Sequence, residues 1–187
     1  TGDTNDLGDD PGEMGDALPA VDLGTGRTAT MIAVGANHSC ALLDDATVKC
    51  WGRSNYGQLG YSNTTTRGDG AGEMGNALPA VSFAAGRTAT AIAAGANHTC
   101  ALLDNAQVVC WGHNYYGQLG QGTTSNIGSS AGSTVAATST INLGTGRTAV
   151  AISAGDMHTC AVLDNATVKC WGSGGNGRLG TGETNDL

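Results

Sequence analysis

The 187-residue sequence has few charged residues, few aromatic residues and almost no proline. Charged residues make up 13% of the chain and apolar residues 40%, so the composition argues against an intrinsically disordered protein. Only 3 prolines accompany 31 glycines, which excludes collagen and a proline-rich linker. No run of 18 apolar residues occurs and no signal peptide is visible, so we expect no membrane insertion.

Positive charge is scarce and unevenly placed, and the formal net charge is −8. Residues 1–60 hold nine acidic and three basic side chains, whereas residues 121–180 hold two acidic and three basic ones. A uniformly basic face cannot be built from this distribution, so we expect no nucleic-acid partner that is held by phosphate contacts. Motifs of catalytic sites are also missing: no Gly-x-Ser-x-Gly, His-Glu-x-x-His or phosphate-binding loop occurs. The sequence therefore predicts no enzyme and no cofactor.

The sequence does contain one pattern that is written three times with a period of 60 residues. The Trp-Gly pair that marks it stands at Trp51, Trp111 and Trp171. The last seven residues repeat the first seven with a single Asp/Glu exchange. A fixed period of this size is typical of a repeat architecture. We therefore divide the chain into repeats at 1–60, 61–120 and 121–180, followed by the start of a fourth at 181–187.

Each repeat predicts short antiparallel strands and no helix. In the first copy, residues 31–34 form an apolar run, and residues 39–43 and 47–51 are strand-like segments around the turn 44–46. Asp and Asn tolerate left-handed backbone angles, which makes this turn a credible hairpin tip. A weaker fourth strand is expected at 18–21, where proline confines it to an edge. Four strands per repeat predict an all-β protein built of β-propeller-type blades.

The six cysteines form three pairs, each with nine residues between its members. Cys40 and Cys50 flank the expected hairpin tip symmetrically, so they face each other across two strands within disulfide reach. We predict three disulfides, Cys40 with Cys50, Cys100 with Cys110 and Cys160 with Cys170. The alternatives are free thiols, or a metal site with His38 that lacks the usual zinc spacing. Paired structural cysteines indicate an oxidising compartment, so an extracellular or cell-surface location is expected.

The order Gly-x-x-His-x-x-Ala-Leu, a hairpin, Val-x-x-Trp-Gly and Tyr-Gly-Gln-Leu-Gly resembles the regulator of chromosome condensation repeat. In the first copy the match runs from Gly35 to Gly60, and the third copy departs from it with Val162 and with residues 177–180. The resemblance implies propeller blades, which in this family normally close into a ring of seven. Three copies cannot close alone, so we expect a partial propeller or array whose ends are covered by neighbouring blades, in the same polypeptide or in other copies.

Two residue types recur in every copy and are interpreted as scaffold. The histidines are expected to hold a neighbouring backbone group, and they stand at His38, His98 and His158. The arginines are expected to donate to carbonyls between blades, and they stand at Arg27, Arg87 and Arg147.

Two segments differ between the copies and are candidate sites. The acidic opening is either a solvated loop or a calcium site, with Asp3, Asp6, Asp9 and Asp10 as ligands. The segment after Trp-Gly is either a free exposed turn or a contact surface, with the candidate residues Arg53, Tyr56, His113, Tyr115 and Tyr116.

Three classes of function remain. The first is a non-enzymatic extracellular structural or adhesive array that presents a repeated surface, and the second is a secreted protein-binding or inhibitor module. The third, guanine nucleotide exchange on a small GTPase, is implied by the family resemblance alone and conflicts with disulfide-stapled blades. The expected partners are other blades or copies of the same protein, or an extracellular protein.

Overall fold

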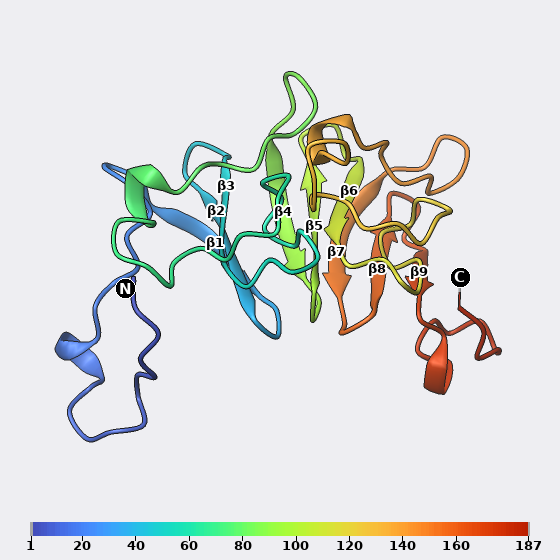
Figure 1. Cartoon of the computed structure of the whole chain (residues 1–187). Coiled ribbons are helices and arrows are strands. Elements are labelled where there is room, and N and C mark those ends of the chain that lie inside the picture. Colours follow the sequence, from blue (N-terminus) through green and yellow to red (C-terminus); the bar gives the residue numbers. More distant parts are fainter. Residues whose placement is uncertain (1, 187) are drawn as a thin grey trace.

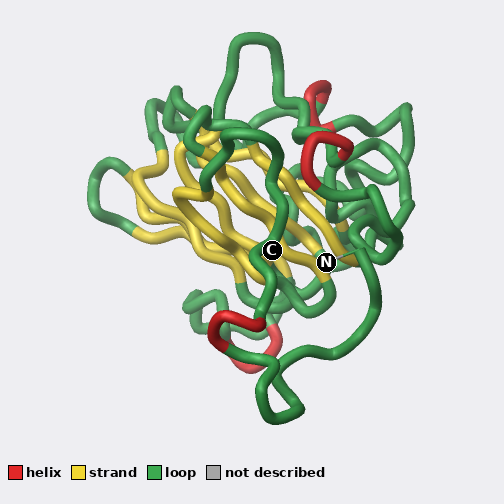
Figure 2. The backbone as a smooth tube through the Cα atoms, turned by 90° about the vertical axis from the view of Figure 1, so that its left-hand side faces the viewer, coloured by secondary structure: helices red, strands yellow, loops and turns green. Residues whose placement is uncertain are grey.

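A computed structural model describes residues 2–186. The chain is all-β, with three antiparallel sheets of three strands each. The strands are β1 (Ala29–Val34), β2 (His38–Leu43) and β3 (Val48–Gly52) in the first sheet, β4 (Ala89–Ala94), β5 (His98–Leu103) and β6 (Val108–Gly112) in the second, and β7 (Ala149–Ala154), β8 (His158–Leu163) and β9 (Val168–Gly172) in the third. Each sheet is one blade of a partial propeller, and the blades stand side by side with loops at both ends (Figures 1 and 2).

The hairpin of each blade closes through a short turn whose last residue is an alanine. Leu43 N donates to Thr47 O at 2.9 Å, and Ala46 N donates to Leu43 O at 3.0 Å. Ala46 has a φ of 62°, as its counterparts do in the other blades. The left-handed residue is therefore the alanine, not the Asp or Asn before it. Asp45 instead accepts hydrogen bonds from the Thr47 backbone N–H at 3.1 Å and from the Thr47 hydroxyl at 2.6 Å. These side-chain hydrogen bonds stabilise the turn.

The predicted fourth strand is wrong: residues 18–21 and 78–81 are not strands, and each sheet within residues 2–186 has three. Residues 78–81 nevertheless run along the outer edge of β3, where Val81 N donates to Val48 O at 2.8 Å. Ile141 N donates in the same way to Val108 O at 2.9 Å. Proline at position 79 removes one donor, so a regular ladder cannot form. The outer edges of the first two blades are thus covered by the leading segment of the next repeat.

Helical structure is limited to single 3-10 turns. These are η1 (Gly15–Ala17), η2 (Gly75–Ala77), η3 (Val135–Ala137) and η4 (Gly175–Gly177). None of them, within residues 2–186, has the length and apolar character needed to cross a membrane. The core consists of two apolar clusters at the junctions between blades, one around Trp111 and one around Trp171.

Candidate functional site

Three disulfides are present in the predicted pairing. Cys40–Cys50, Cys100–Cys110 and Cys160–Cys170 join directly opposed residues of the two hairpin strands, with Cα–Cα distances of 4.1, 4.0 and 4.1 Å. The described part of the chain has no free cysteine. Each blade is therefore stapled independently of its neighbours.

The recurring histidines join blades. His38 Nε2 lies 2.8 Å from Thr99 Oγ1 of the next blade, and Thr99 Oγ1 donates to Gln58 O at 2.9 Å. Because the threonine proton is used on Gln58, His38 must donate from Nε2, and its Nδ1 carries no proton. The same arrangement links His98 to Thr159 at 2.9 Å. The expected scaffold role fits, but the partner is a hydroxyl and not a backbone group.

Burial of these rings lowers the pKa of His38 to about 4. Burial also lowers the pKa of His98 to about 3, with a smaller contribution from the other histidines. Neither Nδ1 atom has a hydrogen-bond partner. Gly35 permits this close fit, because a Cβ there would collide with the His38 ring and the Gly95 carbonyl oxygen. The two imidazole rings are therefore neutral and buried, and they serve to pack neighbouring blades together.

The interpretation of the recurring arginines is wrong. Arg27 Nη1 lies 2.7 Å from Asp45 Oδ2, at the hairpin tip of its own blade, and Arg87 and Arg147 contact Asp104 and Asp164 at 3.3 and 3.5 Å. An acidic residue stands at this tip in every copy, and its recurrence together with the arginine was the available signal. The arginines hold the turns and do not reach carbonyls between blades.

Four candidate contact residues form one continuous surface, which we call the aromatic run. Its members are Tyr56, His113, Tyr115 and Tyr116. Tyr56 and His113, from neighbouring blades, have ring centroids 4.4 Å apart. His113 stacks parallel to Tyr115 at 6.4 Å, and Tyr115 meets Tyr116 edge to face at 4.9 Å. Tyr115 is 68% exposed and Tyr56 36% exposed, so these two rings of the run face solvent, while His113 and Tyr116 are partly buried.

Arg53, the fifth candidate residue, contacts Asn55 of its own loop. With the Asn55 amide oriented so that its oxygen faces the guanidinium, Arg53 donates to it from Nε at 2.9 Å and from Nη2 at 2.7 Å. Arg53 is exposed and shares a loop with Tyr56. Its charge therefore flanks the aromatic run.

Buried amides, which the sequence did not single out, hold these loops. Gln58 Oε1 accepts Tyr56 N at 2.9 Å, and Gln118 Oε1 accepts Tyr116 N at the same distance. Gln118 Nε2 also donates to His113 Nδ1 at 3.1 Å, so the imidazole proton resides on Nε2. Burial lowers the pKa of His113. The shared Tyr-Gly-Gln-Leu-Gly of copies one and two was the sequence signal for this support.

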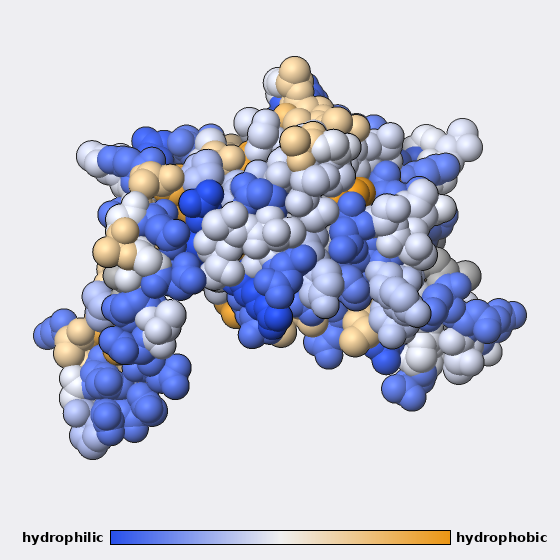
Figure 3. Space-filling model, viewed as in Figure 1, coloured by the Kyte–Doolittle hydropathy of each residue, from blue (hydrophilic) through white to orange (hydrophobic). Residues whose placement is uncertain are grey.

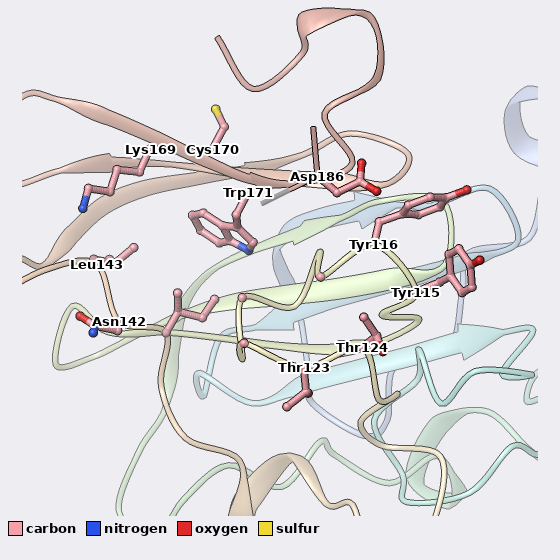
Figure 4. Close-up of a pocket in the computed structure, with 14 residues that line it drawn as sticks. Tyr115, Tyr116, Thr123, Thr124, Asn142, Leu143, Lys169, Cys170, Trp171 and Asp186 are labelled. Atoms are coloured by element: carbon pink, nitrogen blue, oxygen red, sulfur yellow. The ribbon is translucent and has the colours of Figure 1, made fainter. Parts of the chain in front are cut away.

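A groove of about 510 Å³ adjoins the run at the third blade. Figure 4 shows Tyr115 and Tyr116 at one end of it and Lys169 and Leu143 at the other, with Trp171 between them. Asp186 and polar side chains such as Asn142 and Thr123 also line the groove, so it combines apolar surface with charges of both signs. The groove and the aromatic run meet at Tyr115 and Tyr116.

The acidic opening does not converge on an ion. Within residues 2–186, no three side chains of His, Cys, Asp or Glu lie close enough together to hold a metal. Glu13 instead accepts the backbone N–H groups of Gly8 and Asp10 at 2.6 and 3.2 Å. The four aspartates proposed as calcium ligands are exposed. This arrangement gives the calcium hypothesis no preformed site.

Comparison with known families gives a direct match. Residues 31–58, 89–118 and 149–178 match the family described as "Regulator of chromosome condensation (RCC1) repeat", and residues 46–102 and 105–162 match a second family of the same description. These matches span the hairpins and the junctions between blades.

Among individual proteins, the chain is 32% identical over 161 residues to the Ultraviolet-B receptor UVR8 of Arabidopsis thaliana, covering 86% of this chain and 33% of that protein. The solved structure of human WBSCR16 superposes with a TM-score of 0.71 at 20% identity, covering 91% of this chain and 41% of the other. Yeast RCC1 (Prp20), solved bound to Kap60, gives a TM-score of 0.64 at 22% identity over 85% and 35%. The chain thus spans about a third of the length of UVR8.

Proposed function

Because this chain belongs to the regulator of chromosome condensation repeat family, we propose that it is a non-catalytic propeller segment that binds a protein through its loop surface, outside the cytosol. One observation carries this proposal: the aromatic run joins loops of two blades into one exposed surface.

The aromatic run has the chemistry of an interface hot spot. Tyrosine is enriched at such sites because it gives a large contact area with little loss of side-chain entropy. The loops that carry Tyr56 and Tyr116 are held by buried Gln58 and Gln118, so the surface is ordered before any partner arrives. A pre-ordered surface avoids part of the entropic cost of binding.

The disulfides support the proposed location. A bridge lies in every blade, and such bridges persist in oxidising compartments while cytosolic reductants remove them. Yeast RCC1 (Prp20) was solved with a bound protein, Kap60, and a second structure of Prp20p concerns its binding to Gsp1p and histones. We extend to this chain only protein binding by such a propeller, and not those partners.

A structural or adhesive array is the second candidate function. It is favoured by the repetition of one three-stranded, disulfide-bridged blade along the described residues. The two candidates are compatible, because an assembled array would repeat the aromatic run along its length. Guanine nucleotide exchange has no support from a residue of this chain.

A partner screen with three variants tests the binding proposal. Native extracellular material is cross-linked to the wild-type chain, to Tyr56→Ala combined with Tyr115→Ala, and to Val150→Ala as a matched control on exposed β7. A partner should bind the wild type and Val150→Ala equally well. It should bind the double tyrosine variant more weakly, by roughly 1–2 kcal/mol of binding free energy per tyrosine removed. Equal binding by all three proteins, with the fold preserved, would contradict the proposed surface.

A further inference from the structure

Four Asn-x-Ser/Thr triplets occur in the sequence, and this is the acceptor pattern for N-linked glycans. Their asparagines are Asn37, Asn63, Asn97 and Asn165. A glycan is bulky and strongly solvated, so the folded chain has to leave the modified triplet in water. The fold therefore decides which of the four triplets is a usable acceptor.

Three of the triplets are partly enclosed by the fold. Asn37 and Asn97 each precede a buried histidine, and the hydroxyl residue of each triplet lies inside a strand, β2 or β5. That hydroxyl residue is Thr99 in the second blade, where it is fully buried. Asn63 is itself partly buried. None of these three triplets is exposed along its whole length.

The fourth triplet, Asn165 to Thr167, lies at the hairpin tip between β8 and β9. All three of its residues are exposed. The Thr167 hydroxyl donates to Asn165 Oδ1 at 2.7 Å, and the Thr167 backbone N–H donates to the same atom at 3.2 Å. Within residues 2–186, Asn165 Nδ2 makes no hydrogen bond, so the atom that would receive the sugar is open to solvent.

This exposure is a property of the hairpin tip in every blade. Asp45 and Asn105, the counterparts of Asn165, are exposed although another blade follows each of them. The following blade meets the tip at its alanine, where Ala149 N donates to Ala106 O at 2.9 Å. The residue before that alanine thus faces water in all three blades.

The other two tips lack a part of the acceptor chemistry. The first tip has the carboxylate of Asp45 in place of the amide, and this carboxylate lies 2.7 Å from Arg27 Nη1. The second tip has Asn105, but Gln107 follows in place of the hydroxyl residue, and Asn105 Nδ2 donates to Gln107 Oε1 at 2.8 Å. Of the three described tips, the third alone combines an amide, a hydroxyl residue and full exposure.

We propose that Asn165 accepts an N-linked glycan when the chain passes through a secretory pathway, which rests on the proposed location outside the cytosol. In the transfer, Asn165 Nδ2 forms a bond to the anomeric carbon of a lipid-linked oligosaccharide. The bond between that carbon and the lipid diphosphate breaks, and the diphosphate leaves with the electron pair. One amide proton passes to a base of the transferase.

A glycan at this tip starts at the opposite end of the blades from the aromatic run. Each third strand begins after the tip and ends at Trp-Gly, and the loops of the aromatic run follow β3 and β6 at that other end. The five residues of such a strand span about 16 Å. Hydrophilic side chains predominate on the face of the molecule that Figure 3 shows, as expected of a surface that meets water. The glycan therefore leaves the proposed binding surface free.

Secretion of the full chain from a eukaryotic host tests the proposal. Peptide mapping by mass spectrometry should find the glycan on the peptide that contains Asn165, and an amidase that releases N-glycans should convert this asparagine to aspartate. Asn165→Asp gives the third tip the residue of the first, so it should fold and carry no glycan there. Thr167→Val should also lose the glycan. Gln107→Thr supplies the hydroxyl that the second tip lacks and should add a glycan at Asn105.

A secreted chain whose Asn165 is unmodified would overturn the proposal. If the host retains the chain, a purified oligosaccharyltransferase with lipid-linked oligosaccharide is applied to the reduced chain, and an unmodified Asn165 there would also overturn it. So would a glycosylated chain that no longer forms its three disulfides, because the tip would then not tolerate the sugar. Asn165→Asp should bind partners as the wild type does, so failure of the partner screen and failure of glycosylation are separate results.

Discussion

Acidification should destabilise this fold through two buried histidines. His38 and His98 donate from Nε2 to a threonine of the next blade, and their Nδ1 atoms have no acceptor. Protonation of either ring would therefore bury a charged donor without a partner. The folded-state pKa values, about 4 and about 3, lie below the ordinary value of 6.5. The contribution of the two neutral histidines to the unfolding free energy is thus fully present above pH 6.5. It is lost as the pH falls toward their folded-state pKa values.

The magnitude follows from the size of these pKa shifts. Between pH 7.5 and pH 4.5, protonation of each histidine lowers the unfolding free energy by about 2.5 kcal/mol, or by about 5 kcal/mol for the pair. That is a large part of the roughly 5–15 kcal/mol that stabilises a typical domain. For a chain of this length, the melting temperature should fall by about 10–20 °C.

Thermal unfolding followed by far-UV circular dichroism at several pH values measures this loss. The double variant His38→Gln and His98→Gln keeps an amide donor for each threonine but cannot titrate, so its melting temperature should depend much less on pH. The difference between the two profiles removes the contribution of the carboxylates. His113→Gln removes a ring that is only partly buried, so its profile should keep most of the wild-type pH dependence. Parallel profiles for wild type and double variant would refute the reasoning.

Three further predictions concern local stability. Ala166→Gly should raise the unfolding free energy by about 0.5–1 kcal/mol, because glycine adopts the φ of 63° more easily than alanine does. Chemical denaturation measures this free energy, and a decrease would show that the turn is not strained. Thr99→Val should cost about 1–3 kcal/mol by leaving buried polar groups unpaired, while Ser39→Ala, the equivalent change on the open first blade, should cost little in the same assay. Replacing Cys100 and Cys110 together by Ala should cost about 2–4 kcal/mol, and a variant as stable as wild type under oxidising conditions would contradict a structural role for that bridge.

Much of the blade follows from contacts between residues close together in the sequence. The hairpin of β2 and β3 needs only a short turn, and its register places Cys40 opposite Cys50. The repeat of 60 residues predicted three equivalent units, since one pattern folds in the same way in each copy. The loops after Trp-Gly were recognised as candidates because they vary while the hairpins do not. These features depend on local geometry, which the sequence expresses directly.

Other features depend on how blades stack, and local patterns did not reveal them. Residues 78–81 were expected as a strand of their own blade, yet Val81 bonds to β3 of the preceding one. His38 finds its partner 61 residues away, on the next blade. The contact between Tyr56 and His113 likewise exists only because two loops from neighbouring blades emerge side by side.

The sequence by itself therefore determined the repeat, the hairpins, the disulfides and the residues that vary between copies. Tertiary structure alone decided which repeat covers which blade edge, that Lys49 meets a carbonyl of the next repeat, and that Lys169 meets no such group within residues 2–186. The physical reason is distance along the chain. Backbone propensity and hairpin register act over about ten residues, whereas the angle and spacing between blades bring together groups that are 51–61 residues apart.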